Sequence, residues 1–165
     1  MKPMSKVLFI TVSSFALVSC RATARFYPVQ GPLAEQTPPP VYVGKISGAF
    51  YSGNMTVTGK QGEVFRGRWE AVRQPAKSTD APKIAPSDTE MSALWDSIYG
   101  DGFYVANVLG TRLYGRGFLK TSNGDTLKVE FYRPEKATND ANAIRGSIKG
   151  VGKDDKGNVY KITFS

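Results

Sequence analysis

The sequence contains no histidine, and it has a single cysteine, Cys20, among its 165 residues. Without histidine the chain lacks the most common general base and the most common ligand of transition metals in proteins. One thiol cannot form an internal disulfide, and it cannot supply the Cys/His set of a structural zinc site. These absences exclude the many catalytic mechanisms that depend on histidine or on a Cys/His metal site. We therefore expect no enzymatic activity, no metal and no cofactor.

Long apolar runs are also scarce, and the one that is present lies near the amino terminus, at residues 7–18. This run is shorter than the ~20 residues that a membrane-spanning helix needs. Two lysines precede it and the small residue Ser19 follows it, an arrangement typical of a secretory signal peptide. We therefore predict that residues 1–19 are removed by cleavage between Ser19 and Cys20.

The end of this segment, Leu17-Val18-Ser19-Cys20, resembles the lipobox of bacterial lipoproteins. In that family the cysteine thiol is diacylated, signal peptidase II cuts before the cysteine, and the new amine is usually acylated too. The resemblance implies lipid attachment, typically palmitate, at Cys20. The alternative is an ordinary secreted protein whose cysteine is unmodified.

The residue after the cysteine, Arg21, bears on where such a lipoprotein would reside. In Gram-negative enteric bacteria an Asp at this position favours retention in the inner membrane, and Arg21 is not that signal. The resemblance therefore implies a lipid-anchored protein of the outer membrane that faces the periplasm. The rest of the chain is similar to small uncharacterised bacterial lipoproteins, a class that suggests no activity.

Composition indicates one folded domain after a short tether. Hydrophobic residues make up 41% of the chain and aromatic residues 12%, which is enough for a core. Residues 20–40 contain Pro38-Pro39-Pro40, and we expect them to form the lipidated terminus and a Pro-rich tether. Residues 41–165 form the predicted β domain, and the alternative for Phe26-Tyr27-Pro28 is packing on that domain.

The β domain alternates strand patterns with turn signals. Apolar and β-branched residues at every second position predict an all-β fold, an antiparallel barrel or sandwich of about eight strands. The Asn123-Gly124 pair is a strong hairpin signal because it readily adopts positive φ angles. The expected strands are 41–46, 49–60, 63–72, 102–109, 111–121, 125–133, 144–153 and 158–164.

One helix interrupts the strands. Residues 73–87 lack periodicity and predict an exposed loop. Ser87 and Glu90 then have the spacing of a capping box, and Gly100 can end a helix over residues 88–99. The apolar residues of this segment share one helical face that would cover the sheet or plug one end of a barrel: Met91, Leu94, Trp95, Ile98 and Tyr99.

Three predicted hairpins repeat one pattern, with a turn glycine followed by alternating apolar and polar residues. The period of two predicts that one face is buried, while Arg66, Lys128 and Lys161 lie on the other. The chain is basic, with a formal charge of +8, and adjoining hairpins would gather its cations into one positive strip. This candidate binding face consists of Arg66, Arg68, Arg116, Lys128, Lys149 and Lys161.

The sequence thus predicts a non-catalytic binding or structural module. Its expected partners are the membrane, through the lipid, and an anionic envelope polymer or envelope protein on the basic face. No nucleic-acid partner is expected in that compartment. The alternative is a carrier that holds a small apolar ligand in a β-barrel cavity. No motif joins the scattered acidic residues, which we expect to be solvated: Glu63, Glu70, Asp96, Asp101, Asp125 and Glu130.

Overall fold

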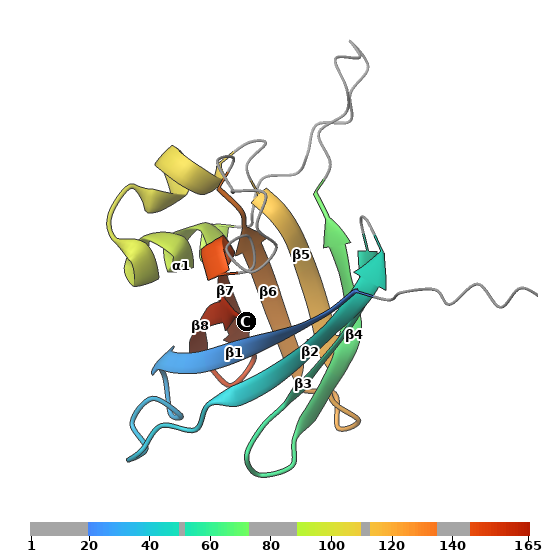
Figure 1. The fold of residues 1–165 in the computed structure, drawn as a ribbon. Coiled ribbons are helices and arrows are strands. Elements are labelled where there is room, and N and C mark those ends of the chain that lie inside the picture. The colour runs from blue at the N-terminus through green and yellow to red at the C-terminus, as the bar shows by residue number, and fades with distance from the viewer. Residues whose placement is uncertain (1–19, 50–51, 73–88, 110–112, 135–145) are drawn as a thin grey trace, which may run out of the picture.

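The computed structural model describes residues 20–49, 52–72, 89–109, 113–134 and 146–165. Eight antiparallel strands form a closed barrel in which each strand pairs with the next and the last pairs with the first (Figure 1). The predicted all-β class is confirmed. The sequence left a barrel and a sandwich open, and the structure is a barrel. The strands are β1 (Cys20–Gln30), β2 (Tyr42–Ala49), β3 (Ser52–Thr58), β4 (Val64–Ala71), β5 (Leu113–Lys120), β6 (Thr126–Tyr132), β7 (Lys149–Asp154) and β8 (Val159–Phe164).

Strand β1 is a correction to the sequence analysis, which expected a tether over residues 20–40. Residues 20–30 instead pair with β2 on one side and with β8 on the other. Ala24 and Phe26 are fully buried, whereas Arg25 between them is exposed. This alternation is the period of a strand with one face in a core. The alternative in which residues 26–28 pack on the domain was therefore the better prediction.

The predicted strand over 102–109 is also wrong. Tyr104–Val108 form a short π-helix, η1, in which Tyr104 and Val108 are buried. Gly100 and Gly102 have φ angles of 105° and 77°, so they turn the chain back toward the preceding helix. The carboxylate of Asp96 then accepts a hydrogen bond from the backbone N–H of Tyr104 at 2.7 Å. The alternating pattern of residues 102–109 therefore does not produce a strand, because the turns at Gly100 and Gly102 return the chain to the helix.

The predicted helix is confirmed as α1 (Thr89–Tyr99). The expected cap Ser87 and the expected loop 73–87 lie outside the described residues, as do residues 1–19, the predicted signal peptide. Of the described helices, none combines the length and the apolar character needed to cross a membrane.

The register of the barrel can be followed along one row of paired residues. The row starts at Cys20 in β1 and returns to β1 at Pro28, which is eight residues further along the strand. Eight strands with a shear of eight enclose an interior that side chains just fill. Between its ends the row passes through Gly48, Gly53, Trp69, Gly117, Val129, Gly152 and Tyr160.

Large apolar side chains occupy this interior. The ring of Phe26 fits because Gly44 faces it, since a Cβ at Gly44 would lie 2.7 Å from the Cε2 atom of Phe26. Phe26 also packs edge-on against Tyr160, with ring centroids 6.1 Å apart. The largest fully buried members of the interior core are Phe26, Met55, Leu119, Leu127, Tyr160 and Ile162.

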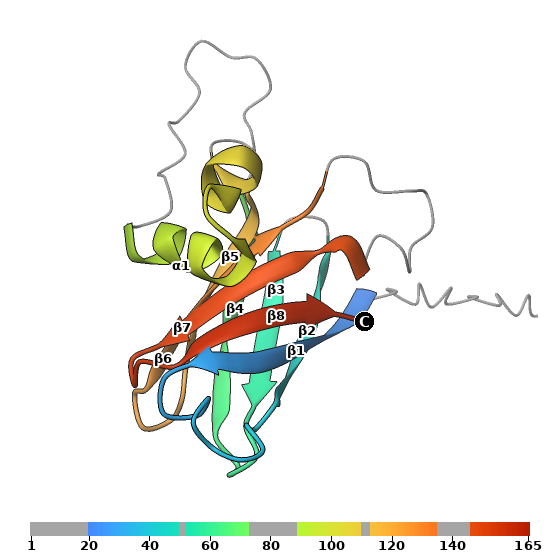
Figure 2. The ribbon, with the colours of Figure 1, turned by 90° about the vertical axis from the view of Figure 1, so that its left-hand side faces the viewer.

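Helix α1 lies on the outside of the barrel, against β7 (Figures 1 and 2). Trp95 is fully buried between the helix and the wall, where Val151 of β7 is also fully buried. The indole N–H of Trp95 donates to the carboxylate of Glu130 on β6 at 3.0 Å. Tyr99 and Phe103 stack beside it with ring centroids 4.9 Å apart. The helix therefore covers the wall instead of plugging an end.

The contribution of β1 can be tested with two neighbouring aromatic residues that point in opposite directions. In a Cys20→Ser background, we expect Phe26→Ala to lower the free energy of unfolding by ~3–5 kcal/mol because it empties the core. Tyr27→Ala is the matched control, since Tyr27 points outward and is 36% exposed, and it should cost less than ~1 kcal/mol. Urea denaturation measures both values, and equal costs would contradict a role for β1 in the core.

Candidate functional site

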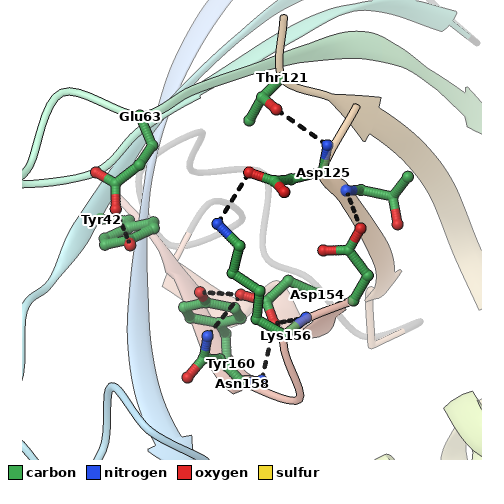
Figure 3. A network of polar contacts seen from close by, with 10 residues as sticks. Tyr42, Glu63, Thr121, Asp125, Asp154, Lys156, Asn158 and Tyr160 are labelled. Atoms are coloured by element: carbon green, nitrogen blue, oxygen red, sulfur yellow. Dashed lines mark hydrogen bonds and ion pairs between the residues drawn. The ribbon is translucent and has the colours of Figure 1, made fainter. Parts of the chain in front are cut away.

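The end of the barrel at the β7–β8 turn is closed by a polar network around Asp154 (Figure 3). The carboxylate of Asp154 accepts backbone hydrogen bonds from Lys156 at 3.0 Å and Asn158 at 2.8 Å. It also accepts bonds from the side-chain amide of Asn158 and the hydroxyl of Tyr160, each at 2.8 Å. Residues 154–158 connect the two strands that the sequence predicted over 144–153 and 158–164, and the carboxylate of Asp154 is hydrogen-bonded within this hairpin.

Two phenols extend this network into the barrel. Tyr42 donates to the carboxylate of Glu63 at 2.8 Å, and its ring lies 5.7 Å from that of Tyr160 (Figure 3). Burial, and then the hydrogen bond to Glu63, raise the pKa of Tyr42 above its ordinary value. Burial, and then Asp154, raise the pKa of Tyr160. Both phenols therefore remain protonated donors, and we assign the network to the stability of the closed end.

The candidate basic face lies on the outer wall of the barrel. Each of its residues alternates along a strand with inward-facing neighbours, as the period of two predicted. Arg66 and Arg68 lie on β4, Arg116 on β5, Lys128 on β6, Lys149 on β7 and Lys161 on β8.

Helix α1 divides these cations into two groups. The ammonium of Lys149 lies 5.2 Å from the ring centroid of Tyr99 and 5.1 Å from that of Phe103. The ammonium of Lys161 lies 5.4 Å from the ring of Tyr99. Both lysines thus contact the aromatic residues that seat the helix through cation–π interactions. The structure separates them from the other four residues, so the single strip that the sequence predicted is not formed.

The other four cations lie at or beside a groove of about 500 Å³ between α1 and the wall formed by β4, β5 and β6. Its lining contains both charged and apolar side chains. Its lining includes Arg68, Glu70, Met91, Arg116, Phe118 and Lys128.

The strand register orders the outer wall below this groove into rows. In one row Phe118 of β5 is flanked by Arg68 of β4 and Lys128 of β6. In the next row toward the closed end Lys120 lies beside Arg66, and the Lys120 ammonium is 5.3 Å from the Phe118 ring. We call Arg66, Arg68, Phe118, Lys120 and Lys128 the Phe118 patch.

The row on the other side of Phe118 alternates in charge. Arg116 lies in register between Glu70 of β4 and Glu130 of β6. Glu130 is a correction to the sequence analysis, which expected a solvated carboxylate. It is only 4% exposed, because α1 covers it and Trp95 donates to it. This row therefore joins the helix to the wall and carries acid beside base.

Sequence reasoning named four cations of this region, did not single out Phe118 or Lys120, and placed Met91 only on the apolar face of the helix. A signal for two of them was present, because Arg116, Phe118 and Lys120 are alternate residues of one predicted strand and must share a face. Phe118 is 46% exposed, an unusual position for an aromatic residue among cations. The position of Met91 at this groove could not be predicted, because the sequence of a helix does not specify which strands the helix packs against.

One acidic residue borders the patch from the helix. The carboxylate of Glu90, in the first turn of α1, lies 3.7 Å from the ammonium of Lys128 and also pairs with Lys153 of β7. All three side chains are partly exposed, so the pairs hold the helix start near the wall with little stabilisation. The groove thus has a charged rim on its helix side.

Searches of protein-family models, curated proteins and solved structures give no match to this chain. In the part of the chain that the structure describes, no three His, Cys, Asp or Glu residues converge as a metal site would require. The functional conclusion therefore rests on the geometry of the wall and on the signals in the sequence.

The closed-end network predicts how stability depends on alkaline pH. The folded pKa values of Tyr42 and Tyr160 exceed their unfolded value near 10; burial also raises the pKa of Tyr99 to about 12. Their contribution is complete below that unfolded value and is lost as pH rises through the folded values. We expect the Tm to fall as the pH rises from about 10 to about 12, as measured by circular dichroism.

Tyr160→Phe isolates one of these groups. It should lower the Tm at neutral pH, because Asp154 loses a hydrogen-bond donor. It should also flatten the alkaline fall, because the variant no longer carries that perturbed phenol. An alkaline slope unchanged by Tyr160→Phe would contradict this assignment.

Proposed function

We propose that this protein is a non-catalytic binding module of the cell envelope, anchored in the outer membrane by lipid on Cys20. Its outer wall contacts anionic envelope components from the periplasmic side. The observation that carries this proposal is the Phe118 patch, which gathers four cations on three adjacent strands around an exposed aromatic ring. A surface of this kind attracts anions and raises their local concentration.

The anchor is supported by the position of the first strand. Cleavage between Ser19 and Cys20 would keep every described residue of β1, including Cys20, which pairs with Gly48 of β2. Lipid on Cys20 would sit directly at the rim, with no tether between membrane and fold.

The patch is supported as a binding surface by the arrangement of its charges. Across β4, β5 and β6, the row of Phe118 and the row of Lys120 contain no acidic residue. Each Lys or Arg near an anionic surface contributes about 1 kcal/mol of attraction. An anionic polymer or an acidic face of an envelope protein fits this distribution.

The alternative function, a carrier of a small apolar ligand, has weaker support. Among the described residues, aromatic and aliphatic side chains occupy the interior, and a shear of eight leaves little further space. The groove described above is outside the barrel and bears charges. We therefore place the binding function on the outer wall.

Lipid attachment can be tested by labelling cells with radioactive palmitate. The natural chain should incorporate label and sediment with outer membranes, whereas Cys20→Ser should lose both properties. Ser19→Ala is the matched control, because alanine keeps a small residue before the cut and lipidation should proceed. Membrane association without label in Cys20→Ser would contradict the anchor.

The binding surface can be tested by charge reversal in the Cys20→Ser background. We expect Arg66→Glu combined with Lys128→Glu to weaken cosedimentation with delipidated envelope fragments at least about tenfold at low salt. The control, Arg25→Glu combined with Lys45→Glu, makes the same change in net charge at exposed positions of β1 and β2. Equal weakening by both pairs would show only a net-charge effect and would contradict the proposed face.

A further inference from the structure

We propose that the groove beside the Phe118 patch binds single molecules of an amphipathic organic anion, a phosphate or carboxylate on a short apolar body. This inference rests on the anion binding proposed above and narrows it to a ligand class and a site. The occupant comes from the aqueous space and not from the bilayer that holds the lipid anchor. The observations are an apolar floor, surrounding cations, a suitable volume and the position of the groove relative to Cys20.

The apolar floor is formed by Phe118, which is 46% exposed, and the buried Met91 of α1 also lines the groove. Outer-wall positions of a barrel in water are usually polar, so an exposed aromatic ring at a groove offers area for an apolar group. Covering that ring would remove apolar surface from water, which is favourable at about 25 cal/mol per Å².

The cations stand where an anionic head group would meet them. Arg68 and Lys128 lie directly across from Phe118 on the neighbouring strands, at a spacing of roughly 5 Å between Cβ atoms. Lys120 approaches the same ring from the next row. Because Lys128 already pairs with Glu90 of α1, a phosphate or carboxylate at the ring edge would meet Arg68 and Lys120 first. The planar fork of Arg68 suits bidentate contact with either group.

The acidic residues of the groove favour one orientation of such a ligand. Glu70 and Glu130 lie in the row beyond Phe118, on either side of Arg116, and Glu130 is already bonded to Trp95. Their charges oppose an anion at that end, so the head group points away from them, toward Arg68 in the lining and toward Lys120 just beyond it. The volume of about 500 Å³ lies in the range of sites for small molecules.

The anchor geometry excludes the neighbouring bilayer as the occupant. Strand β5 is the fourth strand from β1 in either direction round the closed ring, so the two strands lie on opposite walls. The row that starts at Cys20 reaches β5 at Gly117, halfway through the eight-residue shift that ends at Pro28. Lipid at Cys20 therefore holds the rim, while Phe118 lies on the far wall, about halfway down the barrel.

The test uses the mature chain with Cys20→Ser and three probes, namely octyl phosphate below its micelle concentration, inorganic phosphate and octanol. We expect saturable one-to-one binding of octyl phosphate by calorimetry, with NMR shifts at Phe118 and Met91. Inorganic phosphate and octanol should each bind at least about tenfold more weakly, because each offers one half of the contacts.

Two variants separate the contacts. Phe118→Ala should weaken octyl phosphate about tenfold and leave inorganic phosphate unchanged, whereas Arg68→Gln should weaken both. Tyr27→Ala and Arg25→Gln are the matched controls on the opposite wall, and they should leave the Kd unchanged. A Kd for octyl phosphate that is insensitive to both groove variants would overturn the proposal.

A vesicle arm distinguishes the two sources of the anion. If vesicles of anionic lipid bind the chain and lose binding in Phe118→Ala, while octyl phosphate does not bind, the patch is a membrane-docking surface and the proposal is wrong. If charge reversal abolishes envelope association but octyl phosphate does not bind, only this inference fails and the proposed function stands.

Discussion

The pairing of β1 with both β2 and β8 is the interaction on which the rest of the structure depends. Without it the sheet would have two open edges, and the side chains that now fill the interior would face water on one side. Phe26 contributes its ring to that interior, in the space that Gly44 leaves. Because the barrel then closes with a shear of eight, its inside is a packed core, and the surfaces available to partners lie on the outer wall.

Helix α1 determines what the outer wall can do. Its buried Trp95 donates a hydrogen bond to Glu130 and so fixes the helix over β7. This contact also buries the Glu130 carboxylate of the wall. The helix draws Lys149 and Lys161 to its aromatic residues and leaves the Phe118 patch on its other side. The packing of α1 on the outer wall thus divides a broad basic surface. The same contact forms the groove that carries the proposed function.

Local periodicity predicted much of this fold, and its failures have local causes. The alternation around Phe131 and the helical spacing around Trp95 were enough to place their buried faces, and Gly124 has the positive φ of 95° that its turn requires. Strand β1 was missed because the prolines near it are typical of a tether, although Phe26 had the right spacing. Residues 102–109 look like a strand, yet two glycines with positive φ make them part of the helical layer.

The sequence by itself determined which side chains face outward, because a period of two depends only on neighbouring residues. It also contains the segment ending at Cys20 that resembles a lipobox, and it contains no histidine. Only the tertiary structure decided that Arg68, Phe118 and Lys128 are neighbours, since they belong to three strands whose register is set by pairing across the barrel. Strand register and helix docking are non-local contacts, and no short stretch of sequence encodes them.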